Sequence, residues 1–228
     1  MSSKPIVLIL GSGPRVGAAV AKQFANTGYS VAVASRKAVK GLTAEGYLSV
    51  KADLSDPLSL PAIFDAVKAE FHSAPSVVVY NAAALTPPTA DDLFSIPVES
   101  LAADLNINTV SAYAAAQEAV KGWKTLATDS KKPWASASRP LATFSARQMV
   151  GTPKRAIGEL TFDMNRLWAM TDASTSFFYA DERNADGSIK GMQLDGDAHA
   201  DFYAQLASGE GEVPWHATFV KGQGYVRF

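Results

Sequence analysis

A glycine-rich segment near the start of the chain, Gly11-Ser12-Gly13-Pro14-Arg15-Val16-Gly17, constrains the fold more than any other feature. It directly follows the apolar run Ile6–Leu10, which is typical of a buried strand in a parallel sheet. After it, Val16, Val20 and Phe24 recur four residues apart, which predicts a helix that ends near Gly28. A strand, a glycine-rich turn and a helix in this order are typical of a dinucleotide-binding site.

The three glycines of this turn are expected to have separate roles in such a site. Gly11 permits the tight turn, Gly13 lets the backbone approach a pyrophosphate, and Gly17 allows close packing of helix against strand. The free N–H groups and the positive dipole end of the helix favour phosphate. The other residues of the turn that we expect to contact the ligand are Ser12, Arg15 and Val16. The alternative is a glycine-rich turn that binds no ligand.

Strands and helices alternate along most of the chain. Apolar runs predict further strands at residues 29–34, 47–50, 77–80, 176–180, 217–220 and 225–228. Helical spacing predicts helices at residues 60–71, 98–123 and 197–206, the long one with an apolar face formed by Leu101, Leu105, Ala112, Ala116 and Val120. This alternation predicts the α/β class: a single doubly wound, Rossmann-like domain over residues 1–228, with a mostly parallel sheet and helices on both faces.

The middle of the chain carries the weakest pattern. Residues 131–152 are predicted to be irregular, and residues 141–144 are the best candidate for a strand there. Pro153 is suited to the first position of a helix. The helix is then expected to bury the apolar residues that recur at spacings of three and four, namely Ile157, Leu160, Met164, Leu167 and Trp168.

The end of the second strand indicates which dinucleotide binds. An NAD site places Asp or Glu about 20 residues beyond the turn, to bond the ribose hydroxyls. This chain has Ser35, Arg36 and Lys37 there instead. Arg36 can form a fork onto a 2′-phosphate, and Arg15 can add charge to the same pocket. The sequence therefore favours NADP(H) over NAD(H), the alternative being two solvated surface cations.

These residues together resemble the short-chain dehydrogenase/reductase family. The turn Gly11-x-Gly13-x-x-x-Gly17 looks like that of the family, with Arg15 where many members have a further glycine. The resemblance covers about residues 5–125 and, by the order of strands and helices, residues 176–228. It implies a nicotinamide cofactor, oxidoreductase activity on a small molecule, and a homodimer or homotetramer formed through residues 98–123 and 153–173.

Three further segments carry the same resemblance. Asp53-Leu54 is similar to the acidic site of the family beside adenine. Asn81-Ala82-Ala83-Ala84 resembles its Asn-Asn-Ala-Gly segment, with the second Asn and the Gly replaced by Ala. Ile107-Asn108 resembles its Val-Asn, which implies that Asn108 is the structural or proton-relay asparagine. Residues 53, 54 and 81–83 are therefore expected to contact the cofactor.

The catalytic signature of the family is incomplete in this chain. The family uses a Ser and a Tyr-x-x-x-Lys, in which the Tyr is the general acid/base and the Lys lowers its pKa. Counting forward from Asn108, the Ser should fall near residue 135 and the Tyr near residue 150. No tyrosine lies between Tyr113 and Tyr179. The loss of such a group is worth about 10²–10⁴-fold in rate.

Two alignments of this region remain open. Val150-Gly151-Thr152-Pro153-Lys154 keeps the lysine and places Val at the position of the acid, with Ser136 or Ser138 as the nearest serine. Phe144-Ser145-Ala146-Arg147-Gln148 loses both groups. We prefer the first, because Lys154 begins the helix on which the lysine of the family lies. The catalytic candidates are then Asn108, Lys154 and Ser136.

Composition excludes several other classes of protein. With no cysteine, the chain has no disulfides, thiolate zinc sites or cysteine nucleophiles. A net charge of -1 argues against a strongly basic nucleic-acid-binding surface. No apolar run is long enough to span a membrane, and a cytoplasmic location is expected. No metal site is expected either, because His199 and its neighbours Asp195, Asp197 and Asp201 are interpreted as a solvated polar helix start.

Two functions are therefore open. The first is an NADP(H)-dependent oxidoreductase acting on a small carbonyl, imine or alkene, with an atypical proton donor or water. The alternative, which the missing tyrosine favours, is a catalytically weak or inactive NADP-binding sensor or scaffold. Trp215-His216 is a candidate lining of the substrate pocket, although plain packing is equally compatible with the sequence.

Overall fold

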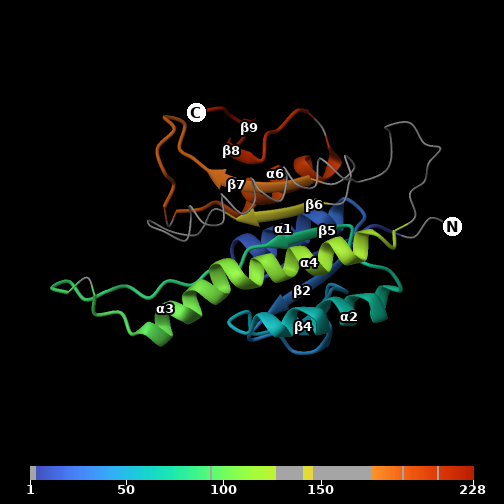
Figure 1. The fold of residues 1–228 in the computed structure, drawn as a ribbon. Coiled ribbons are helices and arrows are strands. Elements are labelled where there is room, and N and C mark those ends of the chain that lie inside the picture. The colour runs from blue at the N-terminus through green and yellow to red at the C-terminus, as the bar shows by residue number, and fades with distance from the viewer. Residues whose placement is uncertain (1–3, 93, 127–140, 146–175, 192, 210) are drawn as a thin grey trace.

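One nine-stranded sheet runs through the computed structural model, which describes residues 4–92, 94–126, 141–145, 176–191, 193–209 and 211–228 (Figure 1). The strand order is β3-β4-β2-β1-β5-β6-β7-β8-β9. All pairs are parallel except β3–β4 and β8–β9 at the two edges. The strands are β1 (Ile6–Leu10), β2 (Ser30–Ser35), β3 (Gly41–Leu42), β4 (Leu48–Lys51), β5 (Val77–Tyr80), β6 (Leu141–Ser145), β7 (Ser176–Glu182), β8 (His216–Val220) and β9 (Gly224–Tyr225). The predicted α/β fold with a mostly parallel sheet is confirmed.

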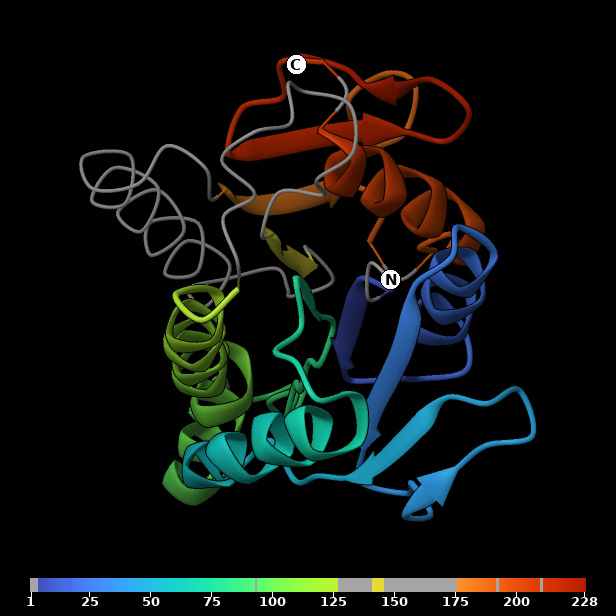
Figure 2. The same ribbon diagram turned by 90° about the vertical axis from the view of Figure 1, so that its right-hand side faces the viewer.

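Helices cover both faces of this sheet (Figure 2). The α-helices are α1 (Val16–Asn26), α2 (Leu60–Phe71), α3 (Val98–Leu105), α4 (Ser111–Trp123) and α6 (Gly196–Ser208). Helices α2 and α4 pack on one face, where Leu8, Leu10, Val78 and Tyr80 lie among their buried side chains. Helices α1 and α6 pack on the other face, against Val7, Ile9, Val77 and Val79. The alternation along β1 and β5 thus divides the core into two layers.

Gly28 ends the first helix, as the sequence predicts. It has a φ of +89°, which an L side chain rarely adopts. Its N–H donates to Ala25 O at 3.1 Å, and the N–H of Tyr29 donates to Phe24 O at 3.0 Å. The rings of Phe24 and Tyr29 meet edge to face at 4.9 Å. This is the Schellman arrangement with its accompanying apolar contact, and it directs the chain into β2.

The long helix predicted over residues 98–123 is interrupted. A π turn, Asn106–Val110, separates α3 from α4. The predicted apolar face holds for Ala112 and Ala116, which are buried, but Leu101 and Leu105 are 46% and 39% exposed. Figure 1 shows the reason: α3 extends beyond the ends of β6 and β7, away from the sheet. The helix predicted from residue 98 is confirmed by α3, and only the apolar face predicted for this half was wrong.

The middle segment contains a strand. Strand β6 confirms the strand candidate at residues 141–144, which lies within the poorly predicted segment 131–152. It pairs in parallel with β5 and β7, in the register Tyr80↔Phe144 and Phe144↔Tyr179. The sequence signal was weak because apolar and polar residues mix in this short strand. The rest of 131–152 and the helix predicted from Pro153 lie outside the described residues.

Several boundaries near the C-terminus also differ from the predictions. Strand β7 and helix α6 are longer than expected, and β9 covers two residues rather than the predicted 225–228. The short strand β3 was not predicted. These differences leave the order of strands and helices unchanged.

Candidate functional site

The glycine-rich turn lies at the carboxyl end of β1, where the strand order reverses. Strand β1 pairs with β2 on one side and with β5 on the other. In open parallel sheets, ligands bind in the crevice at such a switch point. The N–H groups of Gly11 and Ser12 both donate to Ala34 O, at 2.9 and 3.1 Å. The turn is thereby fixed to the end of β2.

Gly11 lies where no side chain fits. Its φ is +96°, and a Cβ atom there would lie 2.4 Å from the backbone N of Ala82. The side chain of Asn81 donates from Nδ2 to Gly11 O at 2.9 Å. The segment after β5 therefore packs directly on the turn after β1. Asn81 Oδ1 is buried and has no hydrogen-bond donor within the described part of the chain.

The other two glycines of the turn differ from each other. Around a Cβ built at Gly13 there is no described atom within 4 Å, so the backbone there is open to a ligand. A Cβ at Gly17 would lie 2.6 Å from Ser12 Cα. Gly17 thus packs α1 against its own turn and not, as predicted, against a strand. Only a residue without a side chain permits this approach.

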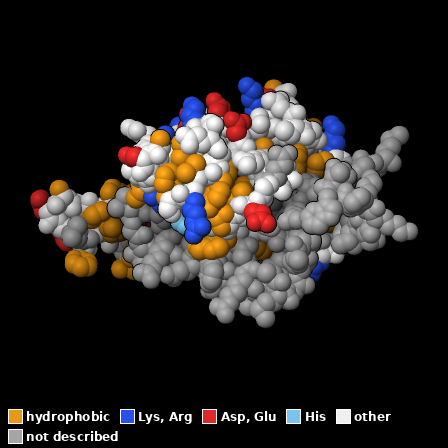
Figure 3. All heavy atoms as spheres, turned by 90° about the horizontal axis from the view of Figure 1, so that it is seen from above, with side chains coloured by type: hydrophobic (Ala, Val, Ile, Leu, Met, Phe, Trp, Pro, Cys, Tyr) orange, Lys and Arg blue, Asp and Glu red, His pale blue; other side chains and the backbone are white. Residues whose placement is uncertain are grey.

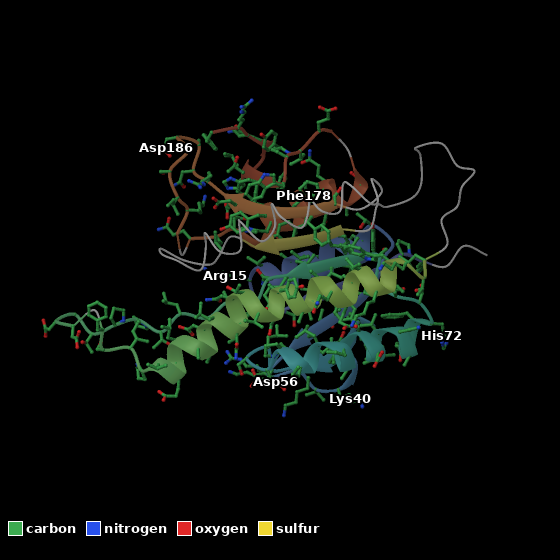
Figure 4. The ribbon with its side chains drawn as sticks, in the orientation of Figure 1. Arg15, Lys40, Asp56, His72, Phe178 and Asp186 are labelled. Atoms are coloured by element: carbon green, nitrogen blue, oxygen red, sulfur yellow. The ribbon has the colours of Figure 1, made fainter. Side chains whose placement is uncertain are left out.

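The first turn of α1 can receive an anion. The helix begins at Val16, has no acidic residue in its first turn and no side-chain cap from Arg15. Figure 4 shows Arg15 at the edge of the molecule where the carboxyl ends of the strands lie. Behind it, a Cβ on Gly196 would lie 2.8 Å from Arg15 O, so the start of α6 packs tightly on the turn. Sequence reasoning missed Gly196, for which a glycine after the helix-capping Asp195 was the available signal.

Two charged side chains lie beside the end of β2. Arg36 is exposed and Ser35 is half-buried. Asp53 accepts hydrogen bonds from the N–H and Oγ–H of Ser55, at 3.0 and 2.8 Å. These bonds hold the pKa of Asp53 below its ordinary value, and the charge of Arg36 lowers it further. Leu54 is buried. The structure therefore brings Arg36 and Asp53 close enough for their charges to interact.

Asn108 is completely buried in the π turn. Its Oδ1 accepts from the N–H of Ala84 at 3.0 Å, and its Nδ2 donates to Ala84 O at 2.9 Å. The side chain of Asn108 thus bonds both the backbone N–H and the backbone C=O of Ala84. The geometry gives Asn108 a structural role in the segment after β5.

The same π turn and Ser111, the first residue of α4, make three contacts that sequence reasoning missed. Tyr80 donates its hydroxyl to Ile107 O. Asn106 Nδ2 donates to Ser55 O at 3.1 Å, and Ser111 Oγ donates to Leu54 O at 2.8 Å. The turn therefore connects the ends of β4 and β5. No local pattern reveals these contacts, because their partners lie far apart in the sequence.

Acidic side chains lie at the end of β7. Asp181 is buried and forms an ion pair with Arg183, whose Nε donates to Asp181 Oδ2 at 2.9 Å. His216 lies with its Nε2 3.7 Å from the same oxygen and is 43% exposed. Its ring also lies 5.5 Å from that of Tyr179. The candidate pocket residue His216 is therefore placed beside a buried carboxylate at the start of β8.

His199 does not lie in a solvated helix start, so that interpretation was wrong. Its side chain is completely buried, with its ring 5.0 Å from Phe219. Nδ1 lies 2.7 Å from Asp195 O, which as a carbonyl must accept, and 3.5 Å from Glu182 Oε2. Burial lowers the pKa of His199. The described residues contain no cluster of three or more His, Asp or Glu side chains that could hold a metal ion.

The remaining catalytic candidates, Ser136, Ser138 and Lys154, lie outside the described residues, as does Val150 at the position of the acid. Of the predicted catalytic set, only Asn108 is described. Within the described ranges, no helix is both long and apolar enough to cross a membrane.

Comparisons of sequence agree with this geometry. A family model described as Enoyl-(Acyl carrier protein) reductase matches residues 14–155. The chain is 35% identical over 239 aligned positions to the short chain dehydrogenase/reductase dmxR12 of Cryptosporiopsis sp. (strain 8999), a match that covers 99% of this chain and 96% of that protein.

Solved structures share the fold at lower identity. A 3-ketoacyl-(acyl-carrier-protein) reductase from Brucella melitensis, complexed with NADH, superposes with a TM-score of 0.72 at 18% identity, over 97% of this chain and 99% of that one. A metagenomic short-chain oxidoreductase in complex with NADP gives a TM-score of 0.70 at 16% identity, over 96% and 99% of the two chains. At these identities the likeness shows the fold alone.

Proposed function

Because this chain belongs to the short-chain dehydrogenase/reductase family, we propose that it is an NADP(H)-dependent oxidoreductase acting on a small carbonyl, imine or alkene. The observation that carries the choice of cofactor is Arg36, exposed directly after β2 in place of an acidic residue. A carboxylate at that position would bond the ribose hydroxyls of NAD and repel a 2′-phosphate. A guanidinium instead pairs with phosphate through two parallel hydrogen bonds.

The described residues fit a dinucleotide. The open backbone at Gly13 and the acid-free first turn of α1 would hold the pyrophosphate. Arg36 and Ser35 would hold the 2′-phosphate, while Asp53 and Leu54 would border the adenine. Asn81 has a buried Oδ1 that lacks a donor among the described residues, so it offers an acceptor to an incoming ligand. Ala82 and Ala83 would line the same edge.

When bound, the nicotinamide ring would give or accept the hydride. Each reduction of a carbonyl also needs one proton at the substrate oxygen. Lys154, Ser136 and water are the candidates for that step, since residues 114–178 contain no tyrosine. Asn108 would act by holding Ala84 in place and not by direct proton transfer, because both polar atoms of its side chain are already bonded.

A second candidate function is a sensor or scaffold that binds NADP without turnover. The missing tyrosine supports it, because a positioned acid/base is worth about 10²–10⁴-fold in rate. The two candidates share one binding site and differ in chemistry alone. Consumption of NADPH therefore separates them.

The experiment combines binding and turnover. Titration with NADPH and with NADH, followed by tryptophan fluorescence, gives the two dissociation constants. NADPH consumption is then followed with panels of carbonyl, imine and alkene substrates. Tighter binding of NADPH and turnover with one panel support the oxidoreductase; tight binding without turnover supports the sensor. Absence of NADPH binding contradicts both. Turnover that survives Lys154→Ala removes Lys154 from the proton step.

We also infer a homodimer or homotetramer formed through residues 98–123. Large apolar side chains before and on α3 and in the first turn of α4 are exposed, namely Phe94, Val98, Leu101, Leu105 and Tyr113. Figure 3 shows hydrophobic side chains at the end of the molecule where this segment projects. Burying them against a second copy would remove the apolar surface from water. A monodisperse monomer in light scattering would contradict this assembly.

A further inference from the structure

We propose that Tyr80 is a positioning residue of the cofactor site, which fixes the π turn from which Asn108 holds the segment after β5. The inference rests on the proposed binding of NADP(H). Tyr80 is the last residue of β5 and is 2% exposed. Its role follows from the partners of its hydroxyl group, since its ring alone could be replaced by that of phenylalanine.

The hydroxyl of Tyr80 satisfies a backbone carbonyl in the π turn. Its oxygen lies 2.5 Å from Ile107 O, to which it donates. A π turn replaces the usual i→i+4 bonds of a helix by i→i+5 bonds, and the hydroxyl of Tyr80 adds a side-chain donor to one of its carbonyls. This hydrogen bond is partly buried. Burial also raises the pKa of Tyr80, which keeps the phenol protonated and able to donate.

The adjacent residue of the same turn holds the next part of the site. Asn108 forms its two hydrogen bonds to Ala84, which lies four residues after Tyr80. Two successive residues of the π turn are thus bonded to the two ends of the segment from residue 80 to residue 84. A shift of the turn would have to break contacts at both ends together.

Between these ends lie the residues that touch the glycine-rich turn. Asn81 Nδ2 donates to Gly11 O at 2.9 Å, and the backbone of Ala82 limits Gly11 to a residue without a side chain. The position of this segment therefore determines that of Gly11. Through Ile107 and Asn108, the hydroxyl of Tyr80 therefore helps to fix the position of the turn that would hold the pyrophosphate.

Replacement of Tyr80 by Phe keeps the ring and leaves the carbonyl of Ile107 without its donor. The loss of this hydrogen bond is expected to let the π turn shift. The contact between Asn108 and Ala84 would loosen with it. The adenosine pocket at Arg36 and Asp53 lies at the ends of β2 and β4 and would be affected less, because of the described residues there only Leu54 and Ser55 are bonded to Ser111 and to the π turn.

The test compares Tyr80→Phe with Tyr179→Phe as a matched control. Tyr179 is also a buried tyrosine on this face of the sheet, but its hydroxyl has no hydrogen-bond partner among the described residues. Two quantities are measured for each variant. The first is hydrogen exchange at the amide of Ala84. The second is the affinity for NADPH and for adenosine 2′-phosphate, a fragment without the pyrophosphate and nicotinamide.

For Tyr80→Phe, we expect the amide of Ala84 to exchange about tenfold faster and the Kd of NADPH to rise about tenfold, while the Kd of the fragment rises less, by at most about threefold. Tyr179→Phe should change none of these quantities. Unchanged exchange at Ala84 in Tyr80→Phe would overturn the proposal. Equal weakening of NADPH and the fragment would also overturn it, because it would indicate a general loss of structure.

The test also covers a wild-type protein that binds no NADPH and a variant that does not fold. If the wild-type protein binds no NADPH, the proposed function fails, while exchange at Ala84 still tests Tyr80. If Tyr80→Phe does not fold, the wild-type protein supplies the test. The hydroxyl proton of Tyr80 should then appear by NMR as a slowly exchanging resonance close to Ile107, and its absence would overturn the proposal.

Discussion

The side chain of Asn81, the residue after β5, donates a hydrogen bond from Nδ2 to the backbone oxygen of Gly11, the residue after β1, over 2.9 Å. The bond joins two segments that are 70 residues apart in the sequence. It shows that the glycine-rich turn is not held by its own strand and helix alone. Substitutions at the contacts of this turn are therefore expected to affect the proposed cofactor site.

Gly11 and Gly13 are expected to respond to alanine in opposite ways. Gly11→Ala places a Cβ 2.4 Å from Ala82 N at a φ of +96°, so the turn must move. We expect a loss of at least about 2 kcal/mol in the free energy of unfolding. Gly13→Ala meets no described atom, so we expect unchanged stability and a Kd for NADPH raised about tenfold or more. Urea unfolding and NADPH titration of both variants measure these changes; equal stability of the two variants would contradict the account.

Gly196 is expected to affect the position of the glycine-rich turn, because it lets α6 pack closely against that turn. A Cβ there would lie 2.8 Å from Arg15 O and 3.2 Å from Ala19 Cβ. In Gly196→Ala, α6 and the turn must separate, at a cost of about 1–3 kcal/mol in stability. NADPH binding should weaken as well, because Arg15 moves. Ser208→Ala, at the exposed opposite end of α6, is the control for both measurements. Full NADPH affinity in Gly196→Ala would show that the packing of α6 has no bearing on the site.

His199 predicts a loss of stability in mild acid. Burial lowers its pKa in the folded protein below the ordinary 6.5, so the unfolded chain takes up the proton first as the pH falls. Below about pH 6.5 the free energy of unfolding should therefore fall, by at most about 1.4 kcal/mol per pH unit, until the pH reaches the folded pKa.

The measurement for His199 is urea unfolding at intervals between pH 5 and 8. The groups facing the imidazole are Glu182, Asp195 and Asp181, which partly oppose the effect of burial. His199→Gln should flatten the profile below pH 6.5, whereas His72→Asn, at an exposed position, should leave it unchanged. A wild-type profile as flat as that of His199→Gln would refute the prediction.

Local patterns in the sequence predicted much of the fold. The turn from Gly11 to Gly17 was recognisable because its three glycines lie between an apolar run and a helical pattern within a short stretch of chain. The bounds of α2 and β5 agree with the prediction, since apolar spacing determines which face is buried. The resemblance to the family identified Asn108, and the position of Arg36 after the second strand placed it beside the turn.

Contacts between distant segments could not be predicted. The π turn is bonded to Tyr80 and Ala84, which lie more than 20 residues before it. The local apolar spacing therefore predicted one uninterrupted helix at this position. The burial of His199 depends on how α6 packs on its sheet face, where Glu182 and Phe219 come from β7 and β8. Gly196 and Gly17 likewise gain their importance from the turn that they pack against.

The most direct test of the central claim is a comparison of NADPH and NADH binding by the wild-type protein and by Arg36→Ala, using calorimetry at one fixed salt concentration. Lys40→Ala, another exposed cation after β2, is the matched control. The account predicts that the wild-type protein prefers NADPH. It also predicts that Arg36→Ala weakens NADPH about 10–150-fold, through the loss of about 1.5–3 kcal/mol, and leaves NADH unchanged. A preference for NADPH that survives in Arg36→Ala, or no binding of NADPH by the wild-type protein, would contradict it.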